Sequence, residues 1–198
     1  TVTFTVADST IGGMAEQTRD ITVAALNDAP TVTVTVSPSS VNEGGTVTLT
    51  GLITDPDAGA STASLTVDWD DPTNANDSVF SLGAINALAV NQTFTSTGAD
   101  TTSVLTVTSV NAATGQVGYR LDHRYTDDGA ATPGSSSRTV SVTVQDNATA
   151  TGTNTAAVTV VNVAPAAEFT VSAVSLNEGG TLTMTGSFTD IGTPDTHS

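Results

Sequence analysis

Apolar and polar residues alternate with a period of two along most of this chain. Val32, Val34 and Val36 alternate with threonine, and residues 65–69 place Leu, Val and Trp on one face. Such alternation is typical of β-strands with one buried face, whereas an amphipathic helix needs a period of 3.6 residues. No apolar pattern with the helical period is long enough to predict an amphipathic helix. Further strands are expected at residues 88–95, 103–109, 117–125, 138–144 and 156–161.

Turn-forming residues separate these segments. Gly, Pro, Asp and Asn cluster between the expected strands, as tight turns require. Short, regularly spaced strands predict an all-β fold, an Ig-like antiparallel β-sandwich. Thr and Val, both β-branched, dominate the composition and favour the same fold. The expected unit is about one hairpin larger than a seven-stranded sandwich, and residues 72–110 are expected to hold the insertion.

An internal repeat runs through the sequence. Residues 41–51 recur as residues 176–186, a displacement of 135 residues. The Ala-Pro pair at 29–30 recurs at 164–165 with the same displacement, so the stretch between these segments stays in register. The first eight residues also resemble residues 139–146.

These matches predict the domain organisation. Residues 1–30 are expected to be the C-terminal part of a preceding repeat, 31–165 a complete β-sandwich repeat, and 166–198 the N-terminal part of a following repeat. Neither flank has enough strands to close a core alone. The chain is therefore expected to be an excerpt of a longer tandem array, or alternatively a subunit whose flanks are completed by a neighbouring molecule through strand addition.

The charge of the chain excludes several classes of partner. The chain has twenty acidic and only four basic residues, which gives a formal net charge of −16, and lysine is absent. Without a cationic patch, nucleic-acid binding and attachment to anionic membranes are not expected. No run of about 18 apolar residues is present, so membrane insertion is not expected either. The absence of cysteine excludes disulfides and thiolate metal sites.

Sixteen of the acidic residues are aspartate, and their placement suggests calcium sites where repeats meet. Calcium takes six to eight oxygen ligands, often from several loops. Two junctions are expected. The first would use Asn27, Asp28, Glu43, Asp55 and Asp57, with Asp8 completing it from the opposite side; the second would use Asp146, Asn162, Glu178 and Asp190. The simpler alternative treats these Asn and Asp residues as turn formers and Glu43 as an exposed charge before a strand.

Two motifs resemble known families of extracellular Ig-like modules. The Asn-Asp-Ala-Pro segment at 27–30, Glu43 and the Asp-Pro-Asp turn at 55–57 are similar to cadherin-type junctions, a resemblance that implies shared interdomain calcium. Residues 67–71 and 123–125 resemble the signatures of PKD-type repeats. Together they cover most of residues 27–165, as in the tandem repeats of large bacterial surface proteins and adhesins. The resemblance is incomplete, since Pro72 replaces an expected Gly and the linker at 162–165 lacks the Asp.

No catalytic residues are expected, and the chain is not expected to be an enzyme. Strand alternation places Trp69 inside and Asp68 and Asp70 on the opposite face, so these acids are interpreted as solvated or calcium-binding rather than as a catalytic pair. His123 shares a face with apolar neighbours and is interpreted as a hydrogen-bonded core histidine. No Ser or Thr has a recognisable nucleophile context, and no glycine-rich phosphate loop precedes a helix.

These observations predict a calcium-stiffened spacer repeat of a large extracellular bacterial adhesin, surface-layer or fibre protein. The expected partners are neighbouring repeats of the same chain and other copies in a fibre or layer. Two alternatives remain open. One is a carbohydrate- or protein-binding module that uses the 72–110 insertion, although a scarcity of exposed aromatic residues disfavours sugars. The other is a polymerising filament subunit completed by strand exchange.

Overall fold

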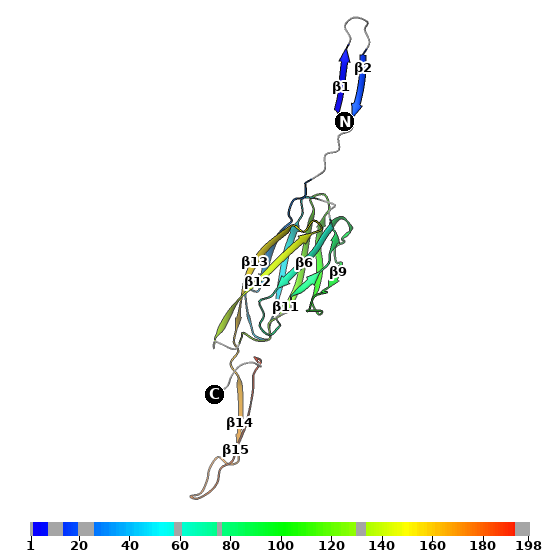
Figure 1. Ribbon diagram of the computed structural model, residues 1–198. Helices are drawn as coiled ribbons and strands as arrows, with labels where there is room; N and C mark the ends of the chain where they lie inside the picture. The colour runs from blue at the N-terminus through cyan, green and yellow to red at the C-terminus, as the bar shows by residue number, and fades with distance from the viewer. Residues whose placement is uncertain are drawn as a thin grey trace.

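The computed structural model describes residues 2–7, 14–19, 26–57, 61–74, 77–129 and 134–192, and these form a nearly all-β structure (Figure 1). No helix in these ranges is long and apolar enough to cross a membrane. The only helix among them is the 3₁₀ turn η1 (Ile85–Ala87). The predicted all-β class is confirmed.

Two facing sheets hold the strands between residues 31 and 161. The first sheet has the order β3-β5-β11-β10-β9: β3 (Thr31–Ser37), β5 (Thr46–Thr54), β11 (Gln116–Arg124), β10 (Val104–Asn111) and β9 (Thr93–Thr95). The second has the order β4-β13-β12-β6-β7, with β8 also paired to β6: β4 (Ser40–Asn42), β13 (Thr151–Val161), β12 (Ser135–Asp146), β6 (Ser61–Asp68), β7 (Ser78–Phe80) and β8 (Gly83–Ala84). The pairing is antiparallel except between β13 and β4.

The core lies between these sheets and is built from the alternating apolar residues of both. On β11 the expected face is confirmed, because Val117, Tyr119, Leu121 and His123 are buried, as is Tyr125 beyond the end of the strand. Trp69 is fully buried beside residues 65 and 67 of β6. One cluster contains the buried apolar side chains of both sheets, so the sandwich has a single core.

The expected strand at 88–95 is largely wrong. Only its last part forms β9, because the chain leaves the 3₁₀ turn at Ala87 without regular structure and then makes a tight turn at 90–91. Asn91 adopts a positive φ of 68°, which Asn tolerates better than most residues and which a strand does not use. Leu88, at the start of this segment, packs against the core from the residues that follow the 3₁₀ turn rather than from a strand.

Two further two-stranded sheets flank the sandwich. They are formed by β1 (Val2–Ala7) with β2 (Met14–Arg19), and by β14 (Ala166–Val171) with β15 (Met184–Thr189). In Figure 1 they lie beyond opposite ends of the sandwich.

The β14–β15 pair repeats the pairing of β3 with β5 in the same register. Val34 faces Gly51 in the sandwich, and Phe169 faces Gly186 in the hairpin, each partner displaced by 135 residues. The apolar residues that correspond to the core face are exposed in the hairpin, with Phe169 at 71% and Phe188 at 60%. The internal sequence repeat is therefore also a repeat of strand pairing.

Candidate cation sites at the two ends of the sandwich

Four aspartates and one asparagine gather at the end of the sandwich where the chain enters from residue 26. Asp55 and Asp57 follow the C-terminal end of β5, and Asp146 ends β12. The linker reaches both groups: the Asp28 amide donates to Asp57 Oδ2 (2.8 Å), and Asn27 Nδ2 donates to Asp146 Oδ2 (2.8 Å). The structure thus brings together most of the residues predicted for the first junction.

Asp55 is the most deeply placed acid of this group. It is 1% exposed, its Oδ1 accepts a hydrogen bond from the Asp57 amide (3.0 Å), and its Oδ2 is buried with no hydrogen-bond donor among the described residues. Burial raises the pKa of Asp55, and the nearby charges of Asp57, Asp146 and Asp28 raise it further. A buried carboxylate surrounded by like charges is destabilised in its ionised form, so a cation would be favoured here.

Asp146 is held in a different way. Its Oδ1 accepts hydrogen bonds from the amides of Ala148 (2.8 Å) and Ala150 (2.9 Å), which form the turn between β12 and β13. The hydrogen bond from Asn27 is the main cause that lowers the pKa of Asp146. This carboxylate is therefore ionised at neutral pH and fixed in position beside the linker.

The donor set of this end fits calcium chemically. Carboxylate and amide oxygens are the ligands that calcium prefers, and they come here from three separate segments. Among the residues that the structure describes, however, no three acidic or histidine side chains converge as a metal site requires. A cation would have to draw these carboxylates together from their present hydrogen-bonded positions.

Glu43 does not belong to this end, and its predicted place in the first junction is wrong. It lies before the start of β5, whereas Asp55 follows the end of the same strand. The strand has nine residues, which at about 3.3 Å per residue separates its two ends by roughly 30 Å. The two residues are close in sequence, but an extended strand carries them to opposite ends of the sandwich.

Glu43 instead organises the second end, where the chain leaves the sandwich. It is 2% exposed, and its Oε1 accepts a hydrogen bond from the Val163 amide of the outgoing linker (2.7 Å). The Asn162 Oδ1 next to this amide is buried without a hydrogen-bond donor in the described part of the chain. Ile191 lies over Gly44, and a Cβ on that glycine would come within 2.6 Å of the isoleucine Cγ2. Asp190, whose carboxylate oxygens are shielded from solvent, precedes this isoleucine.

Two residues predicted for the second junction lie elsewhere. Asp146 is at the first end, beside Asn27. Glu178 is exposed in the turn between β14 and β15, one hairpin length away from Asn162 and Asp190. Both positions follow from the repeat. Each unit carries the Glu of its Asn-Glu-Gly-Gly segment at one end and its turn aspartates at the other end. Asp8 lies outside the described residues.

Asp127 is a further acid of the second end, in an Asp-Asp-Gly segment whose sequence is most simply a tight turn, with calcium binding as the second possibility. It is fully buried and follows Tyr125, whose carbonyl accepts a hydrogen bond from the Gly44 amide (2.7 Å). Its Oδ1 accepts from the Gly129 amide, and its Oδ2 has no donor among the described residues. The Asp-Asp-Gly sequence signals a turn, but only the tertiary structure shows that the first carboxylate is buried.

The two segments that resemble PKD signatures meet in the core. The rings of Trp69 and His123 stack with centroids 4.4 Å apart, and the Tyr125 hydroxyl donates to the Trp69 carbonyl (2.8 Å). His123 Nε2 lies 3.0 Å from Asp71 Oδ2. Hydrogen bonds from His123 and Thr73 lower the pKa of Asp71 against the opposing effect of its burial. The interpretation of His123 as a hydrogen-bonded core histidine agrees with this geometry.

Fold and repeat define the class of the protein as an all-β antiparallel sandwich with internal tandem repetition. No family model matches the chain, and a search of curated proteins found no match. The resemblance to PKD and cadherin modules therefore stays a prediction.

Three solved structures with partial similarity are distant from this chain. The major pilin subunit BcpA of Bacillus cereus has a TM-score of 0.38 and 10% identity, over 86% of this chain and 55% of that one. A variant of the same pilin has a TM-score of 0.37 and 9% identity, over 97% and 64%. The Pseudomonas fluorescens alkylpurine DNA glycosylase AlkC, bound to DNA containing an abasic site analog, has a TM-score of 0.34 and 14% identity, over 67% and 30%. The chain spans less than two thirds of each of these structures, and no function follows from similarities this low.

Proposed function

We propose that this chain is a structural spacer of a large extracellular bacterial surface or fibre protein, stiffened by calcium where its repeats join. The observation that carries the proposal is the cluster around Asp55, in which a buried carboxylate with a raised pKa lies among three other aspartates beside the linker. In this proposal the role is mechanical rather than catalytic. The partners are neighbouring repeats and other copies in a fibre or layer, and not nucleic acid or membrane.

The repeat supports a junction built from two units. Asp55 corresponds to Asp190 and Asn27 to Asn162, each at a displacement of 135 residues. Each junction would therefore combine a linker Asn, the turn aspartate of the following unit and the Glu of the preceding unit. At the second end this places Asn162, Asp190 and Glu43 in one region.

Calcium would supply positive charge that cancels the repulsion between these carboxylates. At the first end Asp28, Asp55, Asp57, Asp146 and the Asn27 amide oxygen would hold it; at the second, Glu43, Asp127, Asn162 and Asp190. Asp57 and Asp146 already bind the linker by hydrogen bonds, so they restrict its motion before any ion binds. Glu43 does the same for the outgoing linker through the Val163 amide.

The test combines calorimetry with small-angle X-ray scattering on the 198-residue chain. Isothermal titration with calcium should show saturable binding, with magnesium as the control because it resists dehydration and prefers a rigid octahedral site. Scattering with calcium and with chelator should give a larger maximum dimension and a narrower distribution of conformations with calcium. Saturable binding without a change in scattering would refute the stiffening. Absence of binding would remove calcium from the proposal.

A further inference from the structure

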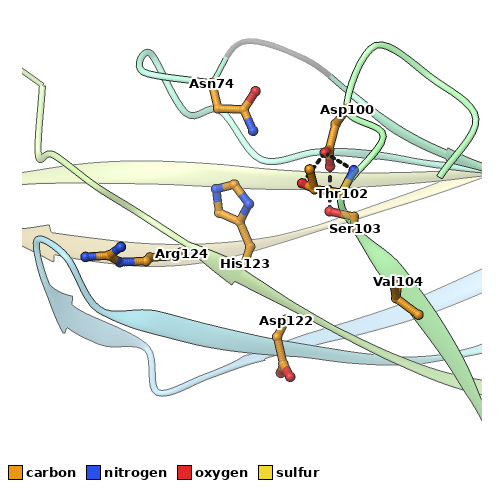
Figure 2. A pocket seen from close by; sticks show the side chains of 8 residues that line it. All are labelled: Asn74, Asp100, Thr102, Ser103, Val104, Asp122, His123 and Arg124. Carbon is orange, nitrogen blue, oxygen red and sulfur yellow. Dashed lines mark hydrogen bonds between the residues drawn. The ribbon is translucent and has the colours of Figure 1, made fainter. Parts of the chain in front are cut away.

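A pocket of about 330 Å³ lies near the second end of the sandwich, where Arg124 of its lining donates from Nε to the Gly44 carbonyl (2.7 Å) (Figure 2). Its walls come from three places: Asn74 in the loop after β6, residues 100 and 102–104 before and at the start of β10, and residues 122–124 at the end of β11. Two of these segments belong to the 72–110 insertion. This volume is at the lower end of the range for small-molecule sites, so a ligand would have to be small.

Buried hydrogen bonds hold one wall of the pocket in place. Asp100 is 5% exposed and accepts hydrogen bonds from the Ser78 hydroxyl (2.7 Å), the Ser103 hydroxyl, and both the amide (2.9 Å) and hydroxyl (2.7 Å) of Thr102. Because the Thr102 and Ser103 hydroxyls give their protons to this carboxylate, their remaining lone pairs can only accept. The wall therefore presents two fixed acceptors.

His123 forms the floor and is held equally firmly. Stacking on Trp69 and the hydrogen bond from Nε2 to Asp71 set the plane and rotation of its ring. No hydrogen bond links its Nδ1 to another residue in the described ranges. In Figure 2 the ring lies below Asn74 and to the left of Thr102 and Ser103.

Asn74 and Val104 add two further groups for a ligand, beside the charged residues Asp122 and Arg124 of the lining. The Asn74 amide supplies two donors and one acceptor, and its side chain makes no hydrogen bond to another described residue. Val104 is 46% exposed and offers a small apolar surface. The pocket thus combines a neutral amide, hydroxyl acceptors, an imidazole edge and one apolar contact.

These groups select the chemical class of the ligand. A metal ion is disfavoured because the oxygens of Asp100 and Asp71 already accept hydrogen bonds. An anion is disfavoured because the charges of Asp122 and Arg124, which both line the pocket, have opposite signs, and because the chain carries a net charge of −16. A purely apolar ligand would leave the polar walls without partners.

We propose that this pocket binds a neutral polyhydroxylated ligand, one sugar residue of a glycan. Ligand hydroxyls would donate to Thr102 and Ser103 and exchange hydrogen bonds with the Asn74 amide. Binding would be weak, since Trp69 and Tyr125 are buried and no aromatic ring in the described lining stacks on the sugar. None of the residues proposed as calcium ligands lines this pocket, so the proposal does not rest on the proposed spacer role.

The test is an NMR titration of the ¹⁵N-labelled 198-residue chain with D-glucose, D-galactose and D-mannose. At least one sugar should cause saturable shift changes at the amides of Asn74, Thr102 and His123. Asn74→Ala should weaken that binding about three- to tenfold, the usual effect of losing one hydrogen bond. Thr101→Ala, an exposed neighbour that does not line the pocket, should bind like the wild type.

Three outcomes would overturn the proposal. The first is the absence of saturable shifts with all three sugars, and the second is equal affinity in the Asn74→Ala and Thr101→Ala variants. The third is a response of these amides to inorganic phosphate or calcium but not to sugars, which would assign the pocket to an ion. Calcium shifts confined to the residues around Asp55 would concern the cation site alone.

Discussion

Replacing Asp55 with asparagine separates the cost of the buried charge from its value as a ligand. Asparagine keeps an oxygen that can accept from the Asp57 amide, but it removes the negative charge that Asp57, Asp146 and Asp28 repel. The pKa of Asp55 is raised above its ordinary 3.8. An acid with a raised pKa stabilises the fold only while protonated, and this contribution is lost as pH rises through the folded-state value. At pH 7 without calcium, Asp55→Asn should therefore be at least as stable as the wild type.

With calcium the wild type should be more stable than Asp55→Asn. An ion that binds only the folded state at 100 times its dissociation constant adds about 2.7 kcal/mol for each site. For a domain of this size, 1 kcal/mol shifts Tm by about 3–5 °C, so one site should raise Tm by roughly 10 °C. Asp55→Asn should lose the part of the calcium-dependent rise in Tm that comes from the site at the first end. It should keep the part that comes from the second end.

Scanning calorimetry of the full chain in chelator and in millimolar calcium measures both effects. Asp68→Asn is the matched control, because it removes the same charge from an exposed residue at the far end of β6 and keeps the acceptor for the Asp70 amide. The reasoning fails if Asp55→Asn shows the full calcium-dependent rise, or if Asp68→Asn loses as much. A large loss of stability in chelator would make Asp55 a structural turn residue.

Three further predictions concern residues that only the structure placed. Glu43→Ala should destabilise the calcium-free chain by about 1–3 kcal/mol in denaturant unfolding, because it leaves a linker amide without its acceptor, whereas Glu43→Gln should lose less than half of that. Gly51→Ala should lower stability by about 1–3 kcal/mol, because its Cβ would collide with Tyr119; the corresponding Gly186→Ala in the open hairpin should have a smaller effect on the melt. Hydrogen bonds lower the pKa of Asp100, so the contribution of its ionised carboxylate to folding stability should be present above pH 3.8 and lost as pH falls below it. In urea unfolding between pH 2 and 5, the free energy of unfolding of Asp100→Asn should therefore depend less steeply on pH than that of the wild type.

The fold class could be predicted because alternation along a strand is a local property. The faces of β6 and β11 follow from the period of two, and the burial of Trp69 and Tyr119 agrees with them. The segment at 88–95 could not be predicted in this way. There Leu88 packs against the core just after a 3₁₀ turn, and a short apolar segment does not reveal whether its backbone is extended.

The membership of each acidic cluster could be predicted only in part. Asn27, Asp28, Asp55 and Asp57 were expected together because short turns and a linker keep them near one end. The sequence places Glu43 with Asp55 because the two are close along the chain. Only the structure shows that the extended strand β5 separates them. The burial of Asp127 has no counterpart in its turn-like sequence.

The sequence alone determined the β-sandwich class, the 135-residue repeat and the types of residue available at the junctions. These depend on periodicity, turn chemistry and self-similarity, which are written along the chain. The tertiary structure decided which acids share an end, which carboxylates are buried, and that the insertion closes a pocket over His123. Those facts depend on strand direction and on contacts between segments more than 100 residues apart, as between Asn27 and Asp146. Local sequence patterns carry no information about such contacts, because the packing of the two sheets creates them.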